Sequence, residues 1–165
     1  MPPTLYLHIG MNKTGTTAIQ QYLRRHRAEL QRAGILYPVA GTHREEAFAH
    51  HKLAKAAGFQ RTPDGDWQPN ARALKAIRSE LDAEIAAQRP HTVLMSSETF
   101  VRDGPPAALR DVTGDMPVKI VVYLRRHDAW MESRYCQNLK MTRPKNVDRE
   151  AGAVAIRNTV AGCRV

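Results

Sequence analysis

The chain has 165 residues, of which 42% are apolar and 25% are charged, and its formal net charge at pH 7 is +9. This length suits a single domain over residues 1–165 with a substantial core, and the composition excludes a largely disordered chain. The N-terminal sequence lacks the basic start and the apolar run of a signal peptide, and no stretch is apolar enough to span a membrane. We therefore expect a cytoplasmic protein.

The positive charge is concentrated in two segments. Residues 1–34 hold five Lys or Arg against one acidic residue, and residues 119–149 hold eight against three. The segment between them is close to neutral. This distribution indicates a polyanionic partner, either a multiply phosphorylated nucleotide or a nucleic acid.

The first predicted elements are a strand over residues 5–9, a loop, and a helix over residues 16–33 that ends at Gly34. Apolar and polar residues alternate along the strand, and the helix repeats its apolar positions at helical spacing, with four arginines mainly on its solvent side. The loop between Gly10 and Gly15 points backbone N–H groups and the positive end of a helix dipole at one place. That place favours a phosphate group.

The loop differs from the GxxxxGK[ST] pattern of ATPases and GTPases. Gly10 and Gly15 keep the spacing of the two glycines, but Thr16 stands where that pattern has lysine. The lysine of this loop, Lys13, lies in its middle. A cation at that position would stand beside the innermost phosphate of a nucleotide, whereas the lysine of the ATPase pattern reaches the outer phosphates.

The next segments carry fewer signals. Residues 35–38 predict a short strand, and residues 44–57 predict a helix. Three histidines in this region, His43, His50 and His51, could indicate a metal site. However, adjacent histidines point to different faces of a helix, and no cysteine or pair of acids completes a ligand set. We expect no metal, and histidines that face a substrate or the solvent.

Two further strands are predicted. Asn70 is expected to cap a helix with an apolar stripe that runs to Gln88, and a strand over residues 92–95 follows. Residues 118–124 are rich in β-branched side chains, which is typical of a strand covered on both faces. Strands separated by helices predict an α/β fold with a parallel sheet flanked by helices, and ligands of such folds bind at the C-terminal strand ends. The loops GMNKTGTT, SSE and RRHD all follow predicted strands and should meet at that edge.

Two strings resemble motifs of the sulfotransferases that use 3'-phosphoadenosine 5'-phosphosulfate (PAPS). KTGTT, which begins at Lys13, resembles the loop that binds the 5'-phosphosulfate, although Asn12 stands where that family usually has proline. Arg125 at a strand end, with Ser133 eight residues later, resembles the motif that binds the 3'-phosphate. The resemblance covers residues 4–140 and implies a P-loop NTPase-like three-layer sandwich that transfers the sulfuryl group without a metal.

The resemblance also implies roles for these residues. Lys13 would neutralise the charge that develops on the departing 5'-phosphate oxygen, and Arg125 with Ser133 would fix the 3'-phosphate. The acceptor would be a hydroxyl or amine of a small molecule or glycan. The expected nucleotide-binding residues are Asn12, Lys13, Thr14, Gly15, Thr16, Thr17, Arg125 and Ser133.

A general base is expected as well, and Glu98, just beyond the strand over residues 92–95, is the first candidate. Glu98 could equally be a surface residue that starts a helix at Thr99. Some sulfotransferases take their base from the region after the first helix, and the sequence leaves that choice open. The candidates there are His43, Glu45, Glu46 and His50.

Sulfotransferases usually continue beyond the Arg/Ser motif, whereas here Asp128 is expected to cap a helix to about Lys140 and the chain ends soon after it. The further helices and the basic, glycine-containing loop of the family have no counterpart in these 165 residues. The resemblance therefore implies that the C-terminal part of the domain is missing. We expect weak nucleotide binding, little transfer activity and exposed apolar surface.

Two other functions fit part of the pattern. A P-loop kinase would share the fold, but the sequence lacks the GK[ST] lysine and a clear acidic residue for magnesium. A basic nucleic-acid-binding module would explain the charge, but only 6% of the residues are aromatic and none cluster near the basic segments for base stacking. We therefore expect no nucleic-acid partner.

Overall fold

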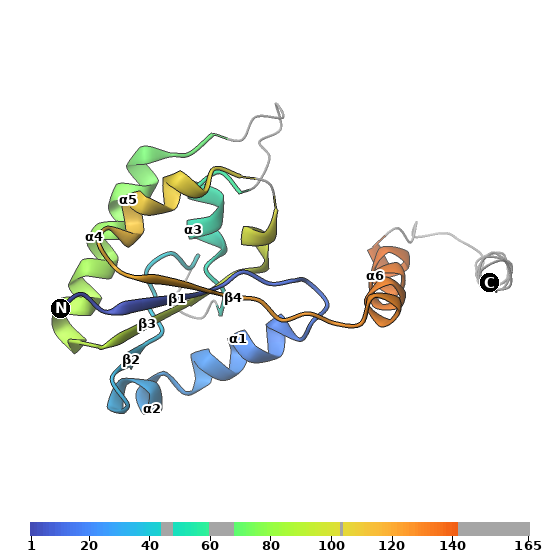
Figure 1. Ribbon diagram of the computed structural model, residues 1–165, viewed down its shortest axis with the longest axis horizontal. Coiled ribbons are helices and arrows are strands. Elements are labelled where there is room, and N and C mark those ends of the chain that lie inside the picture. The colour runs from blue at the N-terminus through green and yellow to red at the C-terminus, as the bar shows by residue number, and fades with distance from the viewer. Residues whose placement is uncertain (44–47, 60–67, 103, 142–165) are drawn as a thin grey trace, which may run out of the picture. The chain divides into compact units, whose positions relative to one another are not determined.

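The α/β class predicted from the sequence is confirmed by the computed structural model, which has a four-stranded, all-parallel sheet with helices on both faces (Figure 1). The chain divides into two compact units, Met1–Arg125 and Arg126–Val165, and each is described by itself. The structure describes residues 1–43, 48–59, 68–102 and 104–141.

The first unit contains the sheet, whose strand order is β2-β3-β1-β4. Helices α1 and α2 lie on one face of the sheet, and α3, α4 and α5 lie on the other (Figure 1). In chain order the elements are β1 (Thr4–His8), α1 (Thr16–Arg25), α2 (Arg27–Arg32), β2 (Ile35–Leu36), α3 (His51–Ala56), α4 (Ala71–Gln88), β3 (Thr92–Ser96), the 3-10 turns η1 (Glu98–Val101) and η2 (Pro106–Leu109), α5 (Arg110–Thr113) and β4 (Val118–Val121).

The register of the strands brings three loops to one edge of the sheet. In β1, His8 pairs with Ser96 of β3 on one side and with Val121 of β4 on the other. Because all three strands are parallel, the segments that follow them leave the sheet side by side. The predicted meeting of these loops is thus confirmed as far as Arg125, the last residue of the first unit.

The core lies between the sheet and α4. Alternate strand residues point to the same face, so Leu5 and Leu7 of β1 enter the core together. The stripe predicted on α4 meets them there, with Leu74, Ile77 and Leu81 fully buried. The predicted cap of α4 is confirmed, because the side chain of Asn70 accepts a hydrogen bond of 3.0 Å from the backbone N–H of Ala73.

The predicted helix over residues 16–33 is wrong in its length, because it breaks at His26 into α1 and α2. The side chain of Arg27, expected on the solvent side, turns inward beyond the break. Its Nε donates to the carbonyl oxygen of Tyr37 (3.0 Å), and the guanidinium lies 5.5 Å from the centre of the Tyr37 ring. These long-range contacts hold the arginine against the segment after β2.

The predicted strand over residues 118–124 is present in part as β4, but its predicted burial on both faces is wrong. β4 lies at the edge of the sheet and pairs with β1. Ile120 is 57% exposed, and Leu124 beyond the strand is 76% exposed. A β-branched composition is typical of a strand that can be buried on both faces, whereas the elements that pack on those faces decide whether it is buried.

The described part of the second unit is α6 (His127–Met141). The helix begins one residue before the predicted cap, so Asp128 lies in its first turn. The Asp128 carboxylate accepts from the backbone N–H of Ala129 (2.8 Å) and from Nε of Arg126 (2.7 Å). The hydrogen bond from Arg126 lowers the pKa of Asp128.

Among the described residues, no helix has the length and apolar character needed to cross a membrane.

Candidate functional site

The loop between β1 and α1 contains three residues with positive φ angles. Gly10 and Gly15 have φ angles of 119° and 89°, and Lys13 has a φ of 66°, which is rare for a residue other than glycine. The Thr14 hydroxyl closes the loop by donating to the carbonyl oxygen of Met11 (2.5 Å). Backbone strain of this kind in a loop is typical of functional sites.

The loop is fixed to the segment that continues β4. The backbone N–H of Tyr123 donates to the carbonyl oxygen of Gly10 (3.0 Å), and the N–H of Met11 donates to that of Tyr123 (3.3 Å). One guanidinium nitrogen of Arg125 donates to the carbonyl oxygen of Lys13 (3.3 Å). The structure therefore brings together Lys13 and Arg125, two cations predicted for the site from segments more than 100 residues apart.

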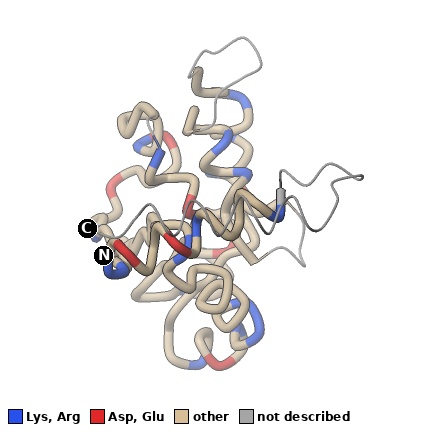
Figure 2. The backbone as a smooth tube through the Cα atoms, turned by 90° about the vertical axis from the view of Figure 1, so that its right-hand side faces the viewer, with Lys and Arg blue, Asp and Glu red and all other residues tan. Residues whose placement is uncertain are grey.

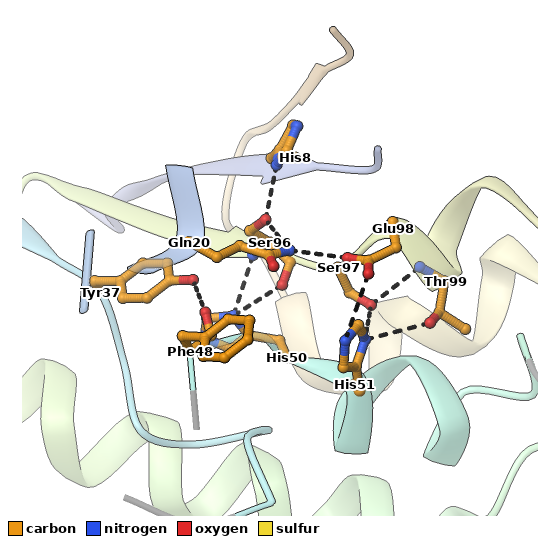
Figure 3. Close-up of polar contacts among 10 residues, drawn as sticks. All are labelled: His8, Gln20, Tyr37, Phe48, His50, His51, Ser96, Ser97, Glu98 and Thr99. Carbon is orange, nitrogen blue, oxygen red and sulfur yellow. Dashed lines mark hydrogen bonds and ion pairs between the residues drawn. The ribbon is translucent and has the colours of Figure 1, made fainter. Parts of the chain in front are cut away.

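Glu98 lies on the other side of the same loop. A Cβ atom added at Gly10 would lie 3.2 Å from the Cα of Glu98, so the loop backbone passes directly against η1. Nε2 of Gln20 donates to Oε2 of Glu98 (3.0 Å), and Nε2 of His51 lies 3.9 Å from Oε1 (Figure 3). Glu98 also starts a short helical turn, as its alternative interpretation expected, and the Ser97 hydroxyl caps that turn by accepting from the N–H of Thr99.

A buried polar network joins the ends of β1 and β3 to α1 (Figure 3). The Ser96 hydroxyl at the end of β3 accepts from Nε2 of Gln20 (2.9 Å) and lies 2.7 Å from Nδ1 of His8. All three residues are at most 3% exposed. Burial lowers the pKa of His8, although the negative charge of Glu98 opposes that shift. The other ring nitrogen of His8, Nε2, is buried and has no hydrogen-bond partner among the described residues.

The sequence did not single out His8 or Gln20, and it marked His51 only as one of three histidines expected to face a substrate or the solvent. The sequence does contain a pattern that marks Gln20. It is a polar residue on the buried side of α1, between Thr16 and Leu23. His8 carries a weaker signal as the last residue of a strand beside a glycine loop. Neither pattern shows which partners the side chains have, since those come from β3 and η1.

The prediction that His50 faces a substrate or the solvent is wrong. Its ring is fully buried, Nε2–H donates to the carbonyl oxygen of Pro38 (3.1 Å), and Nδ1 accepts from the backbone N–H of Ser96 (3.1 Å). Burial lowers the pKa of His50 to about 4, so the ring is neutral at pH 7. His50 therefore fixes the start of α3 against β3, and both ring nitrogens are occupied, which removes it as a candidate base. The predicted helix over residues 44–57 accordingly begins only at His51 within the described residues.

The other predicted residues have varied surroundings. In the loop, Asn12 and Thr14 are half-buried, Thr16 is buried and Thr17 is exposed. His43 is exposed. Glu45 and Glu46, the remaining alternatives for the base, lie outside the described residues.

Ser133 lies on α6 in the second unit and is half-buried there. On the same helix the guanidinium of Arg134 lies 5.4 Å from the centre of the Trp130 ring. Arg126, the neighbour of Arg125, is held by Asp128. Arg125 bonds to the loop within the first unit and Ser133 lies in the second unit, so the predicted pairing of the two stays a prediction.

Basic and acidic residues are interspersed along the described chain (Figure 2). The described ranges do not contain a group of three or more His, Cys, Asp or Glu residues that could hold a metal ion. Comparisons with protein-family models, with curated proteins and with solved structures give no match, so the function is inferred from the site itself.

Proposed function

We propose that this chain binds PAPS and transfers its sulfuryl group to a hydroxyl or amine of a small-molecule or glycan acceptor. The observation that carries the proposal is that one glycine loop contains Lys13 and packs at Gly10 against Glu98. A phosphate cradle, a cation and a carboxylate are the parts that a metal-free transfer needs. The parallel sheet with helices on both faces supports a P-loop NTPase-like three-layer fold for this site.

The loop fits a phosphate group. Gly15 ends the loop as the N-cap of α1, a helix of ten residues, so the free N–H groups of the first turn face the loop. A Cβ atom added at Gly15 would meet nothing within 4 Å, so the space beside the loop is open at this end. Arg125 adds a second positive charge next to Lys13. The donor set is that of an anion site.

The reaction can be assigned to these residues. In an in-line displacement, the acceptor oxygen forms a bond to sulfur while the bond from sulfur to the 5'-phosphate oxygen breaks, and that oxygen keeps the electron pair. Lys13 neutralises the charge that develops there, and the N–H groups of Thr16 and Thr17 hold the 5'-phosphate. Glu98 takes the proton of the acceptor on a carboxylate oxygen. Arg125 binds the 3'-phosphate and so selects the donor nucleotide.

The proposal is tested by thermal unfolding of the whole chain with three ligands added separately: 3'-phosphoadenosine 5'-phosphate, ATP with Mg²⁺, and a single-stranded oligonucleotide. A ligand that binds the folded chain raises the midpoint by mass action, by an amount equivalent to about 2.7 kcal/mol at a hundred times its Kd. We expect stabilisation by 3'-phosphoadenosine 5'-phosphate, and its loss in Lys13→Ala.

Lys75→Ala is the matched control, because it removes the same charge from an exposed position on α4. The control should respond to the nucleotide as the wild type does. Stabilisation by ATP with Mg²⁺ alone would assign a kinase instead, and stabilisation by the oligonucleotide alone would assign a nucleic-acid-binding module.

A further inference from the structure

The carboxylate of Glu98 is approached from two helices that lie on opposite faces of the sheet. Gln20 of α1 donates to Oε2 at 3.0 Å, and His51, the first residue of α3, presents Nε2 at 3.9 Å from Oε1. The side chains of Glu98 and His51 are 29% and 37% exposed, so both reach the surface at the edge where the loops meet. Gln20 is fully buried.

The imidazole of His51 is itself held in place (Figure 3). Its Nδ1 lies 2.7 Å from the Ser97 hydroxyl and 3.3 Å from that of Thr99. The backbone before it is fixed as well, because the N–H of His50 donates to the carbonyl oxygen of Ser96 (2.8 Å). With Nδ1 bound in this way, the opposite nitrogen of the ring is directed at Glu98.

We propose that His51 is a positioning residue for Glu98, an inference that rests on the proposed function. Nε2 of His51 lies 3.9 Å from Oε1, too far for a direct hydrogen bond and close enough for the ring to limit where Oε1 can move. His51 therefore bounds the Oε1 side of the carboxylate by contact while Gln20 fixes Oε2 by a hydrogen bond. Oε1 is the oxygen that meets the acceptor proton, and its placement depends on the ring of His51.

A double-mutant cycle on the rate of transfer from sulfur-labelled PAPS tests this role. His51→Ala should lower kcat about 10-fold, because a misplaced base costs rate, while leaving the affinity for 3'-phosphoadenosine 5'-phosphate unchanged. The same substitution in a Glu98→Gln background should cause no further loss, because a residue that acts through Glu98 has nothing left to position. His51→Gln, whose amide nitrogen has a reach similar to that of Nε2, should recover most of the rate.

Lys52→Ala is the control on the same helix, since Lys52 is paired with Glu80 (3.7 Å) rather than with the site. It should keep the wild-type rate. If the losses of His51→Ala and Glu98→Gln multiply, or if nucleotide affinity falls with the rate, His51 is structural and the inference is overturned although the proposed function stands. A wild-type chain that does not bind the nucleotide at millimolar concentration would overturn the proposed function itself.

Discussion

The candidate site has a buried floor and an exposed rim, and two residues that are neighbours in the sequence belong one to each. His50 belongs to the floor, fully buried with both ring nitrogens bound, whereas His51 beside it reaches the surface and faces Glu98. The rim consists of Lys13, Glu98, His51 and Arg125, and the floor of His8, Gln20, His50 and Ser96. The floor residues are buried and bonded to one another or to the backbone, so substitutions there should change stability, whereas those in the rim should change binding and turnover.

The largest effect is expected at the rim, where Lys13→Ala should abolish measurable sulfuryl transfer without unfolding the chain. The side chain supplies the charge for the leaving oxygen, whereas the bond from Arg125 goes to the backbone carbonyl of Lys13 and survives the substitution. Transfer is followed with sulfur-labelled PAPS, which detects slow turnover, and folding is followed by circular dichroism. A folded variant with a near wild-type rate would show that the loop has another role.

The buried histidines of the floor should make the unfolding free energy of the chain depend on pH. An unfolded histidine binds a proton below its ordinary pKa of 6.5, whereas His50 in the fold does so only below about 4. Its contribution to stability is therefore complete above pH 6.5 and decreases as the pH falls toward 4, by about 3 kcal/mol in all. Burial lowers the pKa of His8 in the same direction.

Urea unfolding at a series of pH values measures this effect. The decrease in unfolding free energy between pH 6.5 and 4 should be smaller in His50→Gln than in the wild type, whatever the stability of the variant at pH 7. His43→Gln, a change at an exposed histidine, should keep the wild-type slope. Equal slopes for all three proteins would mean that protonation of His50 does not contribute to the pH dependence of the unfolding free energy. That result would contradict its role in the floor.

Glu98→Gln should lower turnover by roughly 100-fold, with little change in nucleotide affinity, because the carboxylate meets only the acceptor. The amide keeps the shape of the side chain, and its carbonyl oxygen can still accept from Gln20. Initial rates with labelled donor and calorimetric titration with 3'-phosphoadenosine 5'-phosphate give the two quantities. Unchanged turnover would mean that Glu98 is not the general base, and His43, Glu45 and Glu46 would be the remaining candidates.

A smaller effect than that of Glu98→Gln is expected from Arg125→Ala, which should weaken binding of 3'-phosphoadenosine 5'-phosphate by about 2 kcal/mol. Binding of adenosine 5'-phosphosulfate, which lacks the 3'-phosphate, should hardly change. Arg126→Ala is the neighbouring control, since that arginine is bound to Asp128. Equal losses for both nucleotides would mean that Arg125 acts by holding the loop through the carbonyl oxygen of Lys13.

The sequence predicted the elements whose signals are local. The alternation in β1, the cap at Asn70 and the stripe of α4 depend on residues a few positions apart, and each is present in the structure. The parallel sheet then followed from strands that alternate with helices, and this placed Lys13, Glu98 and Arg125 at one edge.

The features that the sequence missed depend on contacts between distant segments. The break at His26 accompanies the bonds of Arg27 to the segment after β2, and the exposure of β4 follows from its place at the edge of the sheet. The floor of the site joins residues from β1, α1, the N-cap of α3 and β3, and no spacing in the sequence shows that His8 and Gln20 share the hydroxyl of Ser96.

The central claim is that the loop from Gly10 to Gly15 binds the 5'-phosphate of PAPS, and backbone NMR tests it most directly. The ¹⁵N-labelled chain is titrated with 3'-phosphoadenosine 5'-phosphate while the amide signals are followed. The largest shifts should occur at Gly15, Thr16 and Thr17, whose N–H groups begin α1, and they should disappear in Lys13→Ala. Saturable shifts centred on other elements, or no shift at millimolar nucleotide, would contradict the account.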